Sequence, residues 1–218
     1  MINKDYILRL AEQLGRTLAI ILGLRKADRN EDALIYIDDL LLQMLGFTSR
    51  FINSLSEDML VRTFSPLGTL NVEACLWAAS LLKAEGEIYE DMGNSKESYY
   101  RYVKSLRLLL EVLLYEHIDN DSDFYVAAKD LLNKLEDYEL PRSTKEKLFT
   151  YYEHIGQYAK AEDTLFELLE DDSTDSMLVE RGQAFYARLL TKSNSDLIAG
   201  NFSREEVQDG LAQLGQMQ

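Results

Sequence analysis

The sequence predicts an all-α protein, an irregular superhelix of antiparallel helix pairs with about nine to eleven helices. Apolar residues recur at spacings of three and four nearly throughout, which is the period of helices with one buried face. Only two prolines occur, Pro66 and Pro141, whereas strand-rich folds usually need more turn residues. With 46% hydrophobic and 28% charged residues, the chain can bury a core. We therefore expect residues 1–218 to form a single all-helical domain.

Residues 1–46 predict an N-terminal helix pair. The second half of its first helix, at 4–26, reads LAIILGL and is apolar almost all round, so it is buried on several faces or at a contact between subunits. The second helix, at 30–45, ends at Gly46, because glycine favours the conformation that closes a helix. Four apolar residues of the first helix form a candidate dimer patch, namely Leu18, Ile20, Leu22 and Leu24.

The next segment predicts a short helix and then a central helix pair. Ser54 and Glu57 match a capping box for a short helix that ends near Phe64. The sequence SPLGT at 65–69 then breaks the regular pattern. Residues 71–117 contain two long helices, at about 71–91 and 95–116, joined at Met92-Gly93-Asn94, and a further helix covers about 123–137.

The last third predicts a C-terminal pair at 143–171 and then more helices. Ser143 and Glu146 match a capping box for its first helix, and Gly156 turns the chain into its second. The expected elements are helices at about 143–155, 158–171 and 175–192, a loop at 194–201, and a helix within 202–218 that Ser203 and Glu206 cap and that ends in a frayed tail.

Two segments carry small and large residues where two helices of a pair must cross. In LLKAEGEIYEDMGNSKESYYRYVKS, Gly86 supplies the close contact, Tyr89 the large residue, Gly93 the turn, Ser98 the small crossing residue and Tyr102 the aromatic. In LFTYYEHIGQYAKAEDTLFELLEDD, Gly156 serves the turn and Ala161 is the small crossing residue.

Both segments resemble the tetratricopeptide (TPR) motif, a helix pair of about 34 residues. A weaker copy, LRKADRNEDALIYIDDLL, has Asp28 where a turn glycine would be. The three turns lie about two repeat lengths apart, so the resemblance implies a TPR-like array interrupted by extra helices. The opening KDYILRLAEQLGRTLAIILGL resembles a group of uncharacterised TPR-like proteins from Gram-positive bacteria, which implies a fold and no particular activity.

The formal net charge is −15, and all of the excess lies beyond residue 50. Such an acidic surface disfavours nucleic acids and anionic membranes as partners. It serves either as a solubilising surface or as part of a groove for a basic peptide. The single cysteine, Cys75, lies in an apolar run and so predicts a buried thiol. The start of the chain has acidic residues where a secretory signal would be apolar, so we expect a cytoplasmic protein.

No residues form the pattern of a catalytic, metal or cofactor site. His117 and His154 lack further ligands at metal-binding spacing. The run from Asp119 to Asp123 resembles the start of a calcium loop, but Phe124 replaces the required glycine and Asp130 the closing glutamate. Phosphate loops, nucleophile elbows and dinucleotide glycine patterns are also missing. We therefore expect no enzyme and no cofactor.

By the TPR resemblance, the first helices of the pairs line a concave face that binds a protein or peptide. The candidate partner-binding residues on this face are Arg25, Lys26, Lys83, Glu87, Glu90, Asp91, Glu146, Thr150, Glu153 and His154. The predicted function is that of a scaffold or adaptor. Two alternatives stay open, a helical sensor for a signalling peptide or small ligand, and a structural homo-oligomer. The concave face is either open or filled by the chain's own extra helices.

Overall fold

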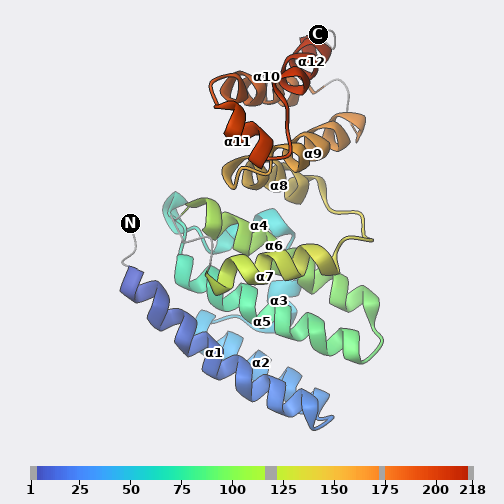
Figure 1. Cartoon of the computed structure of the whole chain (residues 1–218). Coiled ribbons are helices and arrows are strands. Elements are labelled where there is room, and N and C mark those ends of the chain that lie inside the picture. The colour runs from blue at the N-terminus through green and yellow to red at the C-terminus, as the bar shows by residue number, and fades with distance from the viewer. Residues whose placement is uncertain (1–3, 116–121, 172–174, 216–218) are drawn as a thin grey trace. The chain divides into compact units, whose positions relative to one another are not determined.

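A computed structural model describes residues 4–115, 122–171 and 175–215 (Figure 1). The described residues form twelve α-helices and one 3-10 turn and contain no strand, which confirms the all-α class and the antiparallel pairs. The chain divides into two compact units, Met1–Leu140 and Pro141–Gln218, each described by itself.

The first unit contains α1 (Lys4–Lys26), α2 (Asn30–Leu45), α3 (Ser49–Ser54), α4 (Glu57–Thr63), η1 (Pro66–Gly68), α5 (Val72–Asp91), α6 (Ser95–Tyr115) and α7 (Asp123–Lys134). The second unit contains α8 (Arg142–His154), α9 (Tyr158–Asp171), α10 (Ser176–Leu190), α11 (Asn194–Ala199) and α12 (Arg204–Gly215).

The antiparallel pair α5–α6 is the centre of the first unit. Gly93 turns the chain between them with a φ of +74°, a conformation that favours glycine. A Cβ added to Gly86 would lie 2.6 Å from Cε1 of Tyr102, so only glycine lets the two helices approach this closely. The Ser105 hydroxyl donates to the Ala79 carbonyl at 2.7 Å, which pairs a polar group inside this contact.

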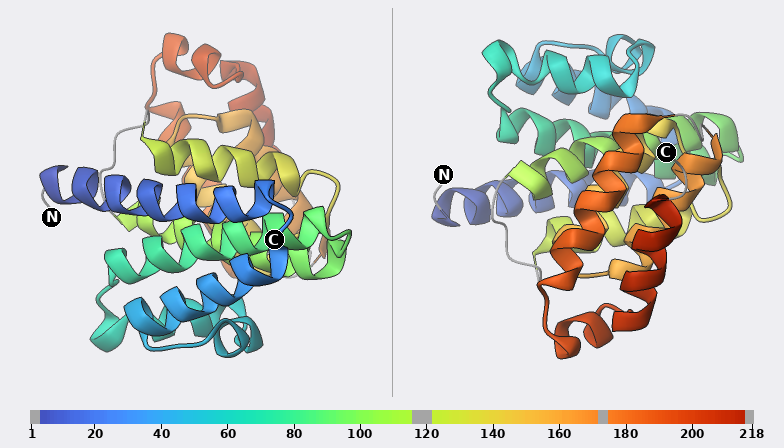
Figure 2. Two further views of the ribbon diagram at one scale, coloured as in Figure 1. Left: turned by 90° about the horizontal axis from the view of Figure 1, so that it is seen from below. Right: turned by 90° about the horizontal axis from the view of Figure 1, so that it is seen from above.

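The N-terminal pair lies against α5, as the views of Figure 2 show. From α2, Ala33, Ile37 and Leu41 are fully buried. The two helices join at Asp28, whose φ is +57°, so the aspartate adopts the conformation that a turn glycine would take. This observation explains how the chain turns without the expected glycine.

A cluster of buried charged groups lies where α3 meets the central pair. The Glu85 carboxylate is 3.2 Å from the Arg101 guanidinium and accepts hydrogen bonds from Ser49 and Asn53 of α3. Lys104 donates to the Asn53 carbonyl at 2.6 Å. Burial lowers the pKa of the Lys104 ammonium, and the neighbouring Arg101 lowers it further. Sequence periodicity did not predict that these charged residues would be buried.

Two capping predictions are wrong. Residues 49–63 form two short helices, and Ser56 rather than Ser54 caps the second, because its hydroxyl accepts from the Met59 N–H at 3.3 Å. The predicted cap at Ser143 is also absent, since α8 begins one residue earlier, after Pro141. In both cases the true start lies within two residues of the predicted one, and the local pattern did not distinguish them.

The predicted loop at 194–201 is also wrong in part, because its first six residues form α11. Ser193 and Asp196 make a capping box there, with both reciprocal hydrogen bonds present. The predicted capping of the last helix is confirmed, as Ser203 and Glu206 exchange the same two bonds.

The second unit is built on the pair α8–α9 and on the packing of α10 against α12. Gly156 turns the chain into α9 with a φ of +75°, as predicted. Ala161 is fully buried, consistent with a crossing position. The largest fully buried side chains of this core are Phe185 and Tyr186.

We predict that Gly200→Ala destabilises the second unit. The new Cβ would lie 2.5 Å from the Gly156 carbonyl oxygen, a backbone atom that cannot move aside easily. We expect a loss of about 1–3 kcal/mol in the free energy of unfolding, measured by chemical denaturation. Gly215→Ala is the control, because a Cβ there meets nothing within 4 Å. Equal stability of the two variants would contradict the packing described.

Candidate functional site: an apolar cavity between α1 and α5

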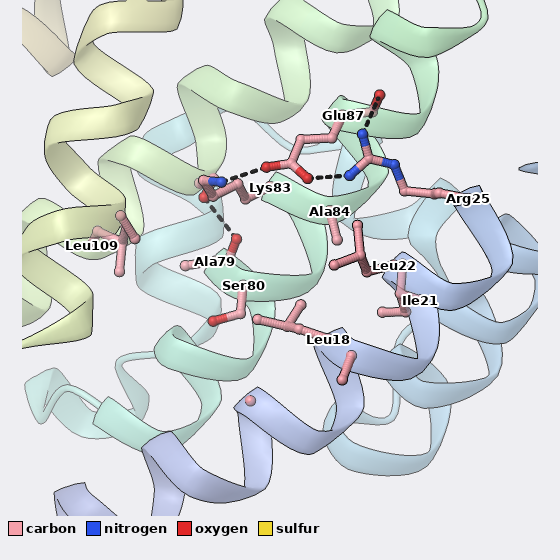
Figure 3. Close-up of a pocket in the computed structure, with 14 residues that line it drawn as sticks. Leu18, Ile21, Leu22, Arg25, Ala79, Ser80, Lys83, Ala84, Glu87 and Leu109 are labelled. Carbon is pink, nitrogen blue, oxygen red and sulfur yellow. Dashed lines mark hydrogen bonds and ion pairs between the residues drawn. The ribbon is translucent and has the colours of Figure 1, made fainter.

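A cavity of about 410 Å³ lies between α1 and α5 in the first unit (Figure 3). Its lining comes from four helices, and most of the lining side chains are apolar. The lining residues are Gly15, Leu18, Ala19, Ile21, Leu22 and Arg25 of α1, Ala79, Ser80, Lys83, Ala84 and Glu87 of α5, Ser105 and Leu109 of α6, and Ala127 of α7.

The cavity exists because small residues face each other between α1 and α5. Gly15 and Ala19 of α1 lie on one side, and Ala79 and Ser80 of α5 on the other. A Cβ added at Gly15 would meet no heavy atom within 4 Å, so this part of the interface is open space. Gly15, Ala19 and Leu22 are exposed, which shows that the cavity reaches the surface.

Polar contacts hold α1 to α5 on either side of the cavity. Near the start of α1, the Tyr6 hydroxyl donates a hydrogen bond to the Glu73 carboxylate. Burial and this hydrogen bond raise the pKa of Tyr6 to about 12, so the phenol stays neutral. At the end of α1, Arg25 forms ion pairs with Glu87 and, at 2.8 Å, with Asp91.

The charged end of the cavity continues from α1 through α5 to α7. Lys83 pairs with Glu87 (Figure 3) and, at 2.9 Å, with Asp130 of α7. Burial alone would lower the pKa of the Lys83 ammonium, but its hydrogen bonds and the two negative charges outweigh burial and raise it. Arg25 shows the same balance with Glu87 and Asp91. Both cations therefore stay charged at any physiological pH.

A second group of paired charges adjoins the first. Glu90 accepts from Lys134 and from the Tyr102 hydroxyl, each at 2.7 Å. Burial would raise the pKa of the Glu90 carboxyl, but these two hydrogen bonds and the positive charges of Lys134 and Arg25 lower it overall. Tyr102 thus joins the packed centre of the unit to its charged surface.

The structure brings five of the candidate partner-binding residues together. Arg25, Lys83 and Glu87 line the cavity, while Glu90 and Asp91 belong to the adjoining ion pairs. Lys26 is exposed at the end of α1 and is not part of the lining.

The other four candidates lie on α8, in the second unit. Glu146 pairs with Arg142 at 3.2 Å and Arg181 at 3.7 Å, and Glu153 accepts two hydrogen bonds from Arg188 at 2.6 and 2.8 Å. Thr150 and His154 are exposed. His117 and residues 119–121 of the calcium-like run lie outside the described residues.

The four residues of the candidate dimer patch lie on two sides of α1. Leu18 and Leu22 are one turn apart and line the cavity. Ile20 and Leu24 are not part of the lining, since each residue of a helix turns the side chain by about 100° and two residues by about 200°. Two positions apart on a helix, side chains face nearly opposite sides, and the dimer contact itself stays a prediction.

Sequence reasoning missed the contributions of α6 and α7. Ser105 and Leu109 of α6 and Ala127 of α7 line the cavity, and Asp130 pairs with Lys83. Asp130 is more than forty residues from Lys83 in the sequence. No local pattern connects two such positions, so only the packing of α7 against α6 shows their relation.

The cavity offers apolar contact and paired charges rather than reactive groups. Among residues 4–115, 122–171 and 175–215, no three His, Cys, Asp or Glu side chains are arranged to hold a metal ion. Cys75 is fully buried, and burial followed by the charge of Glu111 raises its pKa to about 12, so its thiol is not a nucleophile. None of the described helices combines the length and apolar character needed to cross a membrane.

The family model of a family of unknown function (DUF6483) matches the whole chain, residues 1–218. The chain belongs to this family. No curated protein and no solved structure shows significant similarity to it. Family membership therefore names a group of related sequences and brings no activity with it.

We predict that Arg25→Met weakens the attachment of α1 to α5. Arg25 is largely buried beside two carboxylates, so its loss leaves Glu87 and Asp91 without a partner from α1. We expect the free energy of unfolding of the first unit to fall by about 1–2 kcal/mol. This value lies between the contributions of exposed and of buried ion pairs. The fluorescence of Trp77, the single tryptophan, reports this unfolding because it lies in α5.

Arg16→Met is the matched control on the same helix. Among the described residues, Arg16 pairs with Glu12 at 3.6 Å, and both side chains are exposed. Loss of this pair should lower the free energy of unfolding by less than about 0.5 kcal/mol. If both variants unfold at the same denaturant concentration, Arg25 does not hold the helix in place.

Proposed function

We propose that this DUF6483 protein is a non-enzymatic scaffold or adaptor that binds a protein or peptide in the cavity between α1 and α5. The observation that carries the proposal is the cavity itself, an apolar space of about 410 Å³ that reaches the surface beside a group of ion pairs. Such a site can bury apolar side chains of a partner, and its charged end can orient them.

The pKa values of the charged end favour binding over catalysis. A general acid or base works best when its pKa lies near the pH at which it acts. Here the pKa of Lys83 is raised and the pKa of Glu90 is lowered, so both move away from neutrality. Arg25 also stays charged. These groups act as fixed charges rather than as proton carriers.

The TPR resemblance supports the same proposal. The turn glycines Gly93 and Gly156 adopt positive φ, and Gly86 permits a close helix crossing. TPR arrays bind peptides with the first helices of their pairs, which here correspond to α1 and α5. These features are consistent with a cytoplasmic, bacterial interaction protein of TPR type.

Two other functions are supported by specific observations. A sensor of a small ligand is favoured by the volume of the cavity, because sites for small molecules measure about 300–1,000 Å³. A homo-oligomer is favoured by exposed apolar side chains of the N-terminal pair, at Ile20, Ile35 and Leu42.

We predict that Gly15→Leu abolishes binding of the partner. Gly15 lines the cavity and has open space around it, so a leucine side chain there would fill part of the cavity. Replacing a glycine inside a helix should also stabilise α1 by about 0.5–1 kcal/mol, so a loss of binding would not come from unfolding. The measurement is quantitative affinity capture from cells of the source organism with the full chain as bait. We expect at least a tenfold loss of the specifically captured protein.

Gly23→Leu is the matched control, because Gly23 lies on the same helix, is exposed, has no atom within 4 Å of an added Cβ, and does not line the cavity. It should capture as the unchanged chain does. Capture that survives Gly15→Leu would reject the cavity as the protein-binding site. A thermal shift with a small-molecule pool that Gly15→Leu removes would instead support the sensor.

A further inference from the structure

We infer that the cavity receives the apolar side chains of an amphipathic helix of a partner protein, and that this helix carries Lys or Arg beside its apolar face. This inference rests on the proposed function and specifies its ligand. Three properties of the site carry it, namely the nature of its walls, its length along α1, and the balance of charge at its end.

The walls of the cavity favour a helical ligand over an extended one. Lining residues come from α1, α5, α6 and α7, whose backbone N–H and C=O groups are paired within those helices. An extended peptide would bury a row of backbone groups, and the few polar side chains of the lining, such as Ser80 and Lys83, can pair only some of them. A helix pairs its own backbone groups and presents only side chains, so it enters an apolar groove without that cost.

The length of the cavity fits about two to three turns of such a helix. The lining runs along α1 from Gly15 to Arg25, which is about ten residues or roughly 15 Å. Apolar side chains at positions i, i+3 or i+4, and i+7 of a ligand helix span this distance. Leu18 and Leu22 lie within the same stretch of α1 and offer partly exposed apolar surface to them.

The charge at the end of the cavity favours a basic ligand. Its cations are Arg25, Lys83 and Lys134, and its carboxylates are Glu87, Glu90, Asp91 and Asp130, so one negative charge is in excess. Arg25 and Lys83 each already contact two carboxylates, so an acidic ligand would have to displace one of them.

The carboxylates, by contrast, retain capacity to accept further bonds. Asp91 and Asp130 form their ion pairs through Oδ2, and each side chain is 45% exposed. A carboxylate can accept about four hydrogen bonds, so a Lys or Arg of the ligand can join the existing pairs. The net charge of −15 on the whole chain adds a field that attracts a basic segment from a distance.

The test is a selection from a displayed library of helical peptides with randomised surface positions. The full chain is the bait, and peptides that also bind Gly15→Leu are discarded. We expect the retained peptides to share the i, i+3 or i+4, i+7 apolar pattern and to be enriched in Lys and Arg over Asp and Glu. The best peptide and its Lys/Arg→Gln version are then compared by fluorescence anisotropy at low and high salt.

Charge variants locate the effect. The double variant Asp91→Asn, Asp130→Asn should bind the basic peptide about three- to tenfold more weakly than the unchanged chain does. Its affinity for the glutamine version of the peptide should be nearly unchanged. The double variant Glu31→Gln, Asp39→Asn is the control, since both residues are exposed on α2 and the change in net charge is the same. Melting curves confirm that both proteins are folded.

The outcomes separate the two proposals. Retained peptides that are acidic or neutral, or equal weakening by both double variants, would overturn the basic ligand and leave the binding cavity standing. Retained peptides without helical spacing of apolar residues would overturn the helix. If no peptide distinguishes the unchanged chain from Gly15→Leu, both the basic helix and the proposed peptide-binding function are rejected.

Discussion

The close contact between Gly86 of α5 and the ring of Tyr102 on α6 is the constraint on which the first unit depends. It sets the distance between two helices that are buried along almost their whole length, and every other helix of the unit packs around them. The same tyrosine reaches outward through its hydroxyl to Glu90, which pairs with Lys134 of α7. One residue therefore links the tightest packing of the unit to the charged end of its cavity.

The cavity follows from a difference in packing between α1 and the central pair. Of residues 5–26 in α1, only Leu10, Leu14 and Ile21 are buried, and small residues separate the helix from α5. Polar contacts at Tyr6 and Arg25 hold the helix on either side of this gap. A helix held in this way can stay in place while the space beneath it remains available to a ligand. The small number of buried apolar side chains on α1 therefore goes together with the cavity between α1 and α5.

The distribution of charge supports a binding role. The acidic groups at the end of the cavity are paired, yet two of them remain nearly half exposed and can accept a further cation. A pair of buried charges, Glu85 and Arg101, lies instead where α3 meets the central pair, where Glu85 also binds Ser49 and Asn53 of that short helix. Glu85 and Arg101 are thus buried within the fold, whereas Asp91 both pairs with Arg25 and remains partly exposed.

The sequence by itself determined the long helices and their approximate ends, because apolar period and turn residues such as Gly93 and Gly156 act over a few neighbouring positions. It also placed Arg25, Lys83 and Glu87 on one predicted face, which the structure brings together. Only the tertiary structure decided that Asp130 of α7 completes the charged end and that Glu85 is buried against α3. Those properties depend on contacts between distant segments and on the direction of each side chain, which hydrophobic spacing alone does not record.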